Sequence, residues 1–164
     1  MENKVNIKEF VEKFKQCTTE DEKTRLVMKN ITITPYVKVL EKVITIENII
    51  KVANYDKNKK LCINSCIQQV FYVLSIMKLY TNLEVDYTNP LECYDLLEES
   101  GLTDIIMLKI PEKEAMEYSN LFTMAVSDFK ENHCGIRAYM ENELKNIETV
   151  LNGVVDRLSN TVTQ

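Results

Sequence analysis

The sequence predicts an all-α fold, a compact multi-helix bundle that forms a single domain of residues 1–164. Only three Gly and three Pro occur in the chain, whereas an all-β fold needs many turn residues. Hydrophobic residues make up 45% and charged residues 27%, which is typical of a globular domain rather than a disordered chain. In most segments the apolar residues also recur at the three- and four-residue spacing of helices.

The first two predicted helices each begin with a capping residue. Asn6 precedes a segment whose apolar residues follow the i, i+3, i+4, i+7 spacing of one helix face. These residues are Ile7, Phe10, Val11 and Phe14. The helix is expected to end near Cys17. Thr19 and Glu22 then form a capping-box pattern, which predicts the start of a second helix.

The third helix is predicted to start at Thr34-Pro35, because proline is frequent at the first helical position. Ile31 and Ile33 precede it and alternate with threonine in a strand-like pattern. Residues 36–53 keep helical spacing, but many of them are β-branched, which helices tolerate less well. A break near Thr45 is therefore expected.

Residues 61–81 are predicted to form the central, buried helix of the bundle. Apolar residues cover most of its circumference, and a helix that is apolar nearly all round is one that other helices surround. The polar residues 82–89 are expected to end it. Lys57, Lys59 and Lys60, which precede the helix, are expected to lie in a solvated loop.

Further helices are predicted after residue 89. Asn89-Pro90 predicts a helix start with Glu92 at the capping-box position, and Ser100-Gly101 predicts the helix end. Residues 102–110 are expected to form one or two buried turns. Pro111 opens a longer helix that is expected to break at residues 132–135. Its predicted core face contains Ala115, Tyr118, Phe122, Ala125, Val126 and Phe129.

A long C-terminal helix is predicted from about residue 136 to 158. Its apolar residues step by 4, 4, 3, 4, 3 and 4, which is a seam of the coiled-coil type. They are Ile136, Met140, Leu144, Ile147, Leu151, Val154 and Leu158. At 1.5 Å per residue this helix is about 35 Å long. Two arrangements remain open: the seam packs along the bundle of its own chain, or part of it meets a neighbouring subunit.

No group of residues predicts catalysis, a cofactor or a metal. The single histidine, His133, lies next to Cys134, and adjacent side chains on a helix diverge by about 100°. Cys62 and Cys66 are spaced as metal ligands can be, but two buried core thiols are the favoured interpretation. Three isolated glycines cannot form a phosphate-binding loop. We therefore expect that the protein is not an enzyme.

The charge and hydropathy of the chain disfavour nucleic acids and membranes as partners. The formal net charge is −5, whereas phosphate binding needs a concentrated basic surface. The first ten residues contain no long apolar run, so a signal peptide is not expected. The most apolar stretch, residues 70–79, is shorter than the roughly 20 residues of a membrane span. A soluble protein that stays in the compartment where it is made is expected.

Tyrosines are candidates for contacts with other proteins. The chain contains eight tyrosines and no tryptophan, and a tyrosine suits a half-wet interface because its ring is apolar while its hydroxyl forms hydrogen bonds. The alternative is that most of them pack at the rim of the core. The segment from Tyr80 to Tyr87 is expected to form an exposed contact surface. The candidate interface residues are therefore Tyr80, Leu83, Tyr87, Met140, Leu144, Ile147, Leu151, Val154 and Leu158.

Three segments carry a resemblance to a known group of proteins. They are FYVLSIMKLYTNLEVDY, YDLLEESGLTDII and IPEKEAMEYSNLFTMAVSDFKENHCGIRAYME. Over about residues 5–148, the chain resembles small helical proteins of the virion morphogenesis module, which encodes head, neck and tail parts, of tailed phages and prophages of low-GC Gram-positive bacteria. The resemblance implies a non-enzymatic structural or assembly protein, in the first place a head–tail connector (neck adaptor). It assigns no functional residues.

The resemblance also implies partners and a location. The partners would be portal, capsid or tail proteins and further copies of the chain, and the location would be the cytoplasm of the bacterial host during assembly, and the virion. Two alternatives remain open: a tail or capsid assembly chaperone that is absent from the virion, or a phage-encoded inhibitor of a host defence protein. A DNA-binding regulator is disfavoured, because Lys23, Arg25 and Lys29 supply too few basic residues for a recognition helix.

Overall fold

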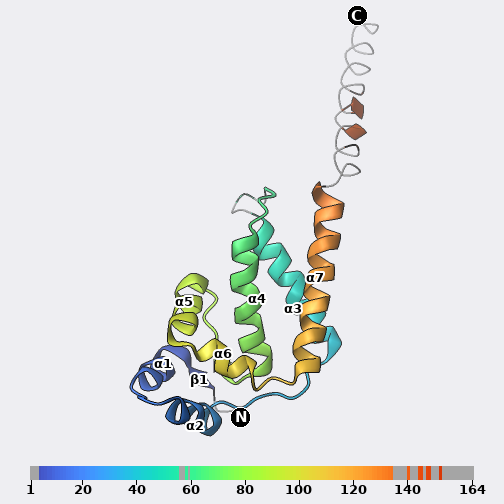
Figure 1. The fold of residues 1–164 in the computed structure, drawn as a ribbon. Helices are drawn as coiled ribbons and strands as arrows, with labels where there is room; N and C mark the ends of the chain where they lie inside the picture. The colour runs from blue at the N-terminus through green and yellow to red at the C-terminus, as the bar shows by residue number, and fades with distance from the viewer. Residues whose placement is uncertain are drawn as a thin grey trace, which may run out of the picture. The chain divides into compact units, whose positions relative to one another are not determined.

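The computed structural model describes residues 4–55, 58, 60–134, 140, 144–145, 147–148 and 152. These residues form α-helices with one small two-stranded sheet (Figure 1), so the predicted all-α class is confirmed. The chain divides into two compact units, Met1–Thr123 and Met124–Gln164. That it forms a single domain stays a prediction.

Two β–α segments lie side by side in the first unit. β1 (Val5–Asn6) leads directly into α1 (Ile7–Lys15), and β2 (Leu83–Glu84) is followed by α5 (Pro90–Ser100). The two strands pair in parallel. The helices that come next, α2 (Glu20–Asn30) and α6 (Leu102–Met107), also contact each other. Each element of the first segment therefore packs against its counterpart in the second.

Two ion pairs define the direction of α1 against α5. The Lys8 ammonium lies 2.7 Å from the Glu92 carboxylate, and the Lys15 ammonium lies 3.0 Å from the Glu99 carboxylate. Both pairs join residues that are 84 positions apart in the sequence, so the two helices run in the same direction. All four side chains are exposed, so the pairs contribute little to stability. The buried faces of these helices hold the two segments together.

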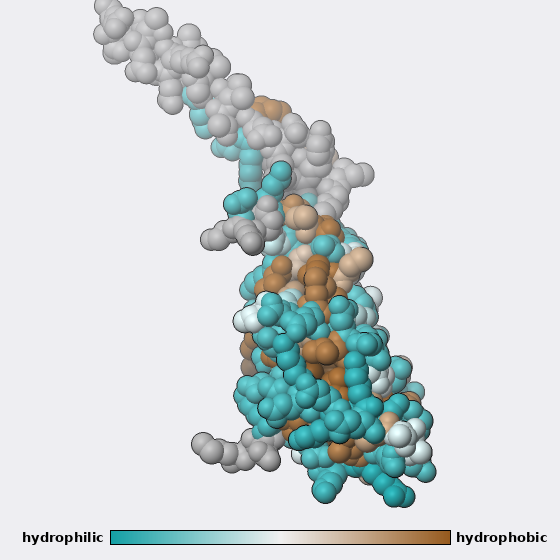
Figure 2. Space-filling view, turned by 90° about the vertical axis from the view of Figure 1, so that its left-hand side faces the viewer, coloured by the Kyte–Doolittle hydropathy of each residue, from teal (hydrophilic) through white to brown (hydrophobic). Residues whose placement is uncertain are grey.

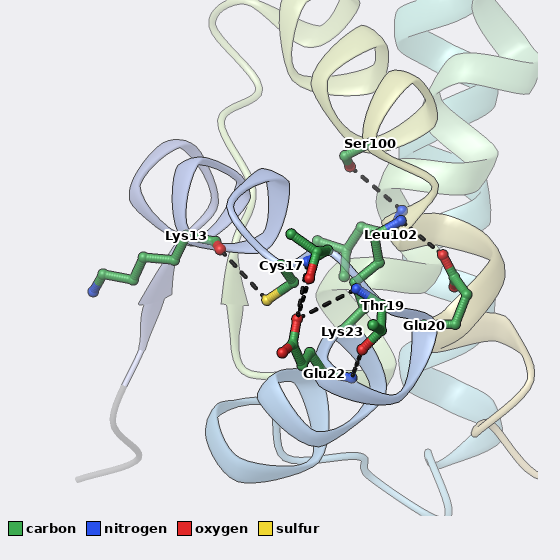
Figure 3. Close-up of polar contacts among 9 residues, drawn as sticks. Lys13, Cys17, Thr19, Glu20, Glu22, Lys23, Ser100 and Leu102 are labelled. Carbon is green, nitrogen blue, oxygen red and sulfur yellow. Dashed lines mark hydrogen bonds and ion pairs between the residues drawn. The ribbon is translucent and has the colours of Figure 1, made fainter.

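The caps predicted for the first two helices are confirmed. The Asn6 side chain accepts a hydrogen bond from the backbone N–H of Glu9. Thr19 and Glu22 form the complete capping box at the start of α2, in which each side chain accepts a bond from the other's backbone N–H. Figure 3 shows the Glu22 carboxylate turned toward the backbone of Thr19, beside the ion pair of Lys23 and Glu20.

Removing this cap is expected to cost a measurable part of the stability. Thr19→Ala leaves the N–H of Glu22 without its acceptor, and we expect a loss of about 1 kcal/mol in the free energy of unfolding. Urea unfolding followed by circular dichroism measures it. Thr19→Ser, which keeps the hydroxyl, should retain the stability of the parent. Equal losses in the two variants would show that the methyl group, rather than the cap, is responsible.

The cap predicted for α5 is only partly present. The helix starts at Pro90 and ends at Ser100, as predicted, and Gly101 follows in the left-handed conformation with a φ of 73°. However, the Asn89 side chain makes no cap hydrogen bond. Glu92 does not form a capping box because its carboxylate pairs with Lys8 on α1. A contact that is distant in the sequence has replaced the local one.

The remaining helices of the first unit pack around α4 (Ser65–Tyr80). α4 contacts α3 (Val39–Asn54) and also α5 (Figure 1), so the prediction of a central buried helix is confirmed. Its buried residues are Gln68, Val70, Phe71, Leu74, Ser75, Ile76, Met77 and Tyr80. The helix begins four residues later than expected because Asn64 caps it, accepting a bond from the N–H of Ile67.

The start of α3 differs from the prediction. The helix begins at Val39 and not at Pro35. Contacts that are distant in the sequence keep the preceding residues extended: Ile33 forms an antiparallel bridge with Thr81, and the backbone N–H of Val37 donates to the Glu114 carboxylate. The helix is also continuous through Thr45, where a break was expected. Burial of its inner face outweighs the low helix propensity of its β-branched residues; the buried apolar residues are Ile46, Ile49, Ile50 and Ala53.

The last helix with described bounds, α7, runs from Glu112 to Cys134. The break predicted at residues 132–135 is absent from 132–134, because the helix continues through them; Gly135 lies outside the described residues. On the predicted core face, Tyr118 is fully buried and Phe122 packs against the cluster of Ile49, Ala53 and Phe71. The other residues of that face, Ala115, Ala125, Val126 and Phe129, are half-buried.

The predicted helix of residues 136–158 is described at only a few positions. Those positions are residues 140, 144–145, 147–148 and 152, and all of them are helical. Ile136, Leu151, Val154 and Leu158 lie outside the described residues. Of the helices in the described part of the chain, none combines the length and the apolarity that crossing a membrane requires.

Candidate interaction surfaces

Two of the residues predicted to form an exposed contact surface are buried. Tyr80 is the last residue of α4, and its ring lies edge-on to that of Tyr118, with 6.3 Å between the ring centroids. Leu83 lies in β2, where it pairs with Val5. Both side chains belong to the core. The prediction that Tyr80 and Leu83 are exposed is therefore wrong, because Tyr80 packs against Tyr118 and Leu83 is held in the sheet.

Tyr87, the third candidate of this segment, remains partly accessible. Its side chain is 36% exposed, and its ring stacks on that of Phe71 at a centroid distance of 6.1 Å. The Lys78 ammonium lies 5.0 Å from the centroid of the Tyr87 ring, within the range of a cation–π contact. Burial raises the pKa of Tyr87 to about 12. The phenol is therefore neutral at physiological pH and presents an apolar ring.

Tyr87 lies beside an open groove between α3 and α4. The groove is lined by Thr45, Asn48, Ile49, Val52, Phe71, Lys78 and Tyr87 and has a volume of about 300 Å³. We call it the α3–α4 groove. Most of this lining is apolar, and Lys78 is the charged residue among the described residues that line it. It is the size of a small binding pocket and can take a few side chains.

The apolar surface continues along the outside of α3. Val52 at the groove is 59% exposed, and Ile44 and Leu40 are 49% and 70% exposed. Leu40, Ile44 and Asn48 are each separated by four residues, so they share one face of the helix with the groove. The space-filling view in Figure 2 likewise shows hydrophobic side chains reaching the surface among hydrophilic ones. Several large exposed apolar residues on one helix face are typical of a surface that binds another protein.

A second apolar surface lies in the C-terminal unit. Met140, Leu144 and Ile147 are helical and are 57%, 62% and 54% exposed. We call these three residues the C-terminal row. Their spacing of four and three residues places them on one face of a helix. These are the described members of the predicted interface seam; the candidates Leu151, Val154 and Leu158 lie outside the described residues.

A buried ionic cluster ties α3 to α7. The Lys42 ammonium lies 2.7 Å from the Glu114 carboxylate and 3.2 Å from that of Glu117. The same oxygen of Glu114 also accepts hydrogen bonds from the Tyr80 hydroxyl at 3.2 Å and the backbone N–H of Val37 at 3.3 Å. Lys42 is fully buried and Glu114 nearly so. Every charge in this cluster therefore has a partner, as burial requires.

The cluster is expected to make stability depend on pH. Burial opposes the charge of Glu114, but hydrogen bonds and the charge of Lys42 outweigh it and lower the pKa of Glu114 below its usual value of 4.5. A carboxyl group whose pKa is lower in the folded than in the unfolded protein stabilises the fold at pH values above its unfolded-state pKa. This stabilisation is lost as the pH falls through its folded-state pKa. The pKa of Lys42 is raised in turn, against the effect of its burial, by hydrogen bonds to Glu114 and Glu117.

We therefore expect the free energy of unfolding to decrease as the pH falls below about 4.5. Glu114→Gln should flatten this decrease, because the amide does not titrate. Urea unfolding between about pH 3 and pH 7 measures the slope. If the free energy of unfolding fell equally steeply with decreasing pH in the parent protein and in the variant, other carboxyl groups would be responsible.

The residues considered for chemistry are not brought together. Cys62 and Cys66 are exposed, so the expectation of two buried thiols is wrong; Leu61 is held in a bridge to Tyr55 outside the helix, and the segment lies at the surface. His133 is exposed and stacks on the Phe129 ring. Within the described ranges, no three His, Cys, Asp or Glu side chains are placed to hold a metal ion.

Comparison of the chain with models of protein families, with curated proteins and with solved structures found no match. The candidate interaction surfaces are the α3–α4 groove, the apolar face of α3 and the C-terminal row. The groove was not predicted from the sequence. Its lining comes from three separate segments, and the alternation of exposed and buried residues along α3 is the one local signal that points to it.

Proposed function

We propose that this chain is a non-enzymatic structural or assembly protein of a tailed bacteriophage, in the first place a head–tail connector. The exposure of large apolar side chains in both units carries the proposal; they include Leu40, Ile44, Val52, Met140, Leu144 and Ile147. Such side chains lose contact with water when a partner covers them, which is the main driving force of protein association. The resemblance to virion morphogenesis proteins supplies the phage context.

The proposed partners are other virion proteins, namely portal, capsid or tail proteins, and further copies of the chain. A component of a head–tail neck repeats one contact around a closed ring, and such a contact joins two different surfaces of neighbouring copies. The α3 face and the C-terminal row are two different apolar surfaces of one chain. The protein would act in the host cytoplasm during assembly and remain in the virion.

Quantitative mass spectrometry of purified phage particles tests the proposal. The measurement counts copies of this chain relative to the major capsid protein. About a dozen copies per particle would support a place in the neck, where ring symmetry is of that order. Hundreds of copies would move it to the shell or the tail. Absence from particles, with the protein abundant in the lysate, would refute a structural role and favour an assembly chaperone or an inhibitor of host defence.

A further inference from the structure

We infer that residues 35–38, which lead into α3, have two conformations: the extended one of the structure, and a helical one in which they form an additional first turn of α3. We call residues 35–38 the switch segment. All of its contacts named below lie within the described part of the first unit, and the inference does not depend on the proposed function. It rests on the backbone N–H group of Val37, for which the chain offers two acceptors.

In the extended conformation the acceptor is distant in the sequence. The backbone N–H of Val37 donates to the Glu114 carboxylate at 3.3 Å, and the Val37 side chain is buried. The same carboxylate oxygen binds the Lys42 ammonium at 2.7 Å and the Tyr80 hydroxyl at 3.2 Å. Groups from α3, α4 and α7 therefore meet at one oxygen atom beside the switch segment.

A second acceptor lies next to Val37 in the sequence. When Pro35 takes the first helical position, Thr34 becomes the N-cap and Val37 becomes the third helical residue. The hydroxyl of an N-cap threonine accepts a bond from the N–H of the second or third helical residue, so Thr34 can replace Glu114 as the acceptor. Pro35 loses no hydrogen bond because it has no N–H. The groups that the helical state needs at its start are therefore all local.

The helix start in the structure is weaker than this local one. Lys38 occupies the N-cap position of α3, and its side chain makes no cap hydrogen bond. A lysine has no acceptor to offer, and its charge lies at the positive end of the helix dipole. In the helical state Lys38 lies one turn inside the helix, where lysine is favourable. Contacts with distant segments therefore hold the switch segment extended against its local preference.

The extended state predominates in the free chain because it buries Val37 and keeps two distant contacts. A helix rises about 1.5 Å per residue and an extended segment about 3.3 Å. The helical state therefore shortens the segment and draws Ile33 away from its bridge with Thr81. It follows that the bridge and the bond from Val37 to Glu114 open together.

The helical state enlarges the apolar face of α3. Val37 precedes Leu40 by three residues and Ile44 by seven, so a helical Val37 lies on the same face as these two side chains. Leu40 is 70% exposed and Ile44 is 49% exposed. A partner that covers this face contacts one more apolar side chain in the helical state. Its binding therefore shifts the segment toward the helical state.

Three substitutions of carboxylates test the inference in the full chain. The readout is NMR: the backbone chemical shifts and the sequential amide–amide contacts of residues 35–38. Glu114→Ala removes the distant acceptor, and we expect helical values. Glu114→Gln keeps an oxygen for the N–H of Val37 and should stay extended. Glu117→Ala is the matched control: it removes the other carboxylate of Lys42 but not the acceptor of Val37, so the segment should stay extended.

Two further variants test the local acceptor and the buried side chain. Thr34→Val removes the hydroxyl and keeps the shape of the side chain. Combined with Glu114→Ala, it should lower the ratio of helical to extended state about fivefold, the factor expected for a lost N-cap. Val37→Ala leaves the ionic cluster intact and removes most of the buried side chain that favours the extended state, so it should raise the helical population even if Glu114→Ala does not fold.

Three results would overturn the inference. The first is a switch segment without helical values in folded Glu114→Ala, or in Val37→Ala where Glu114→Ala does not fold. The second is a Glu117→Ala chain with the same helical values as Glu114→Ala, which would assign the change to the ion pair of Lys42. The third is an unchanged helical population when Thr34→Val is added, which would show that Thr34 is not the cap.

Discussion

Lys42→Ala should lower the free energy of unfolding by about 3–5 kcal/mol, because it leaves the buried charge of Glu114 without its partner. Glu114 would keep hydrogen bonds from Tyr80 and from the N–H of Val37, but these are dipoles and do not neutralise its charge. The loss should be largest at neutral pH, where the carboxylate is ionised. Urea unfolding of the parent and the variant at pH 7 measures it.

A double substitution separates the effect of the lost charge from the effect of the lost side chain. Lys42→Met with Glu114→Gln removes both charges, keeps the volume of the two side chains, and leaves an acceptor for the N–H of Val37. We expect it to be much less destabilised than Lys42→Ala, since replacing a whole buried pair is often neutral. If the double variant were as unstable as Lys42→Ala, packing of the lysine stem would account for the loss.

Tyr118→Ala should cost a similar amount, about 3–5 kcal/mol, by opening a cavity where α7 meets α4. The Tyr118 side chain is fully buried and contacts two further tyrosine rings, with centroid distances of 5.7 Å to Tyr72 and 6.3 Å to Tyr80. Few neighbouring groups can move in to fill the space. Chemical unfolding with full baselines provides the measurement.

Tyr118→Phe is the matched control for this position. It removes the hydroxyl, which lies 2.6 Å from the Ser75 hydroxyl, and keeps the ring. Ser75 still donates to the carbonyl of Tyr72, so it does not become an unsatisfied group. The expected loss is about 1 kcal/mol. A loss in Tyr118→Phe as large as in Tyr118→Ala would assign the stability to the hydrogen bond rather than to the ring.

Features that depend on neighbours in the sequence were predictable. The caps at Asn6 and Thr19 join residues that are three apart, so the residues that make the contact can be read together. The same holds for the left-handed turn at Gly101. The central helix was predictable because apolar residues on every side of a helix imply neighbours on every side.

Features that depend on distant residues were not predictable. Thr34-Pro35 is a sound local signal for a helix start, but the bridge of Ile33 to Thr81 and the bond from Val37 to Glu114 keep that segment extended. Lys42 gave no signal of burial, because its partners lie on a helix more than 70 residues away. Glu114 gives no local signal either, because its partners Val37, Lys42 and Tyr80 all lie in other segments of the chain.

The candidate surfaces were likewise predictable only where they depend on neighbours in the sequence. The periodicity of the sequence identifies Met140, Leu144 and Ile147 as one row, and their exposure follows from the structure. The groove cannot be read from periodicity, because α3, α4 and the segment that holds Tyr87 contribute to it from separate parts of the chain. Tyr80, at the end of α4, and Tyr87, in the segment between β2 and α5, differ for this reason too: only tertiary packing decides which of them reaches solvent.

The parallel pairing of the two β–α segments delays the folding of the first segment while the protein is being synthesised. The ion-paired residues of α1 and α5 are 84 positions apart, and ribosomes add about 5–20 residues per second. The second segment is therefore completed about 4–17 s after the first segment. During that time the face of α1 that packs against α5 stays uncovered, whereas α3 and α4 are neighbours in the sequence and can pair earlier. The nascent N-terminal helices are thus the part of the chain most open to chaperones and proteases before the protein is complete.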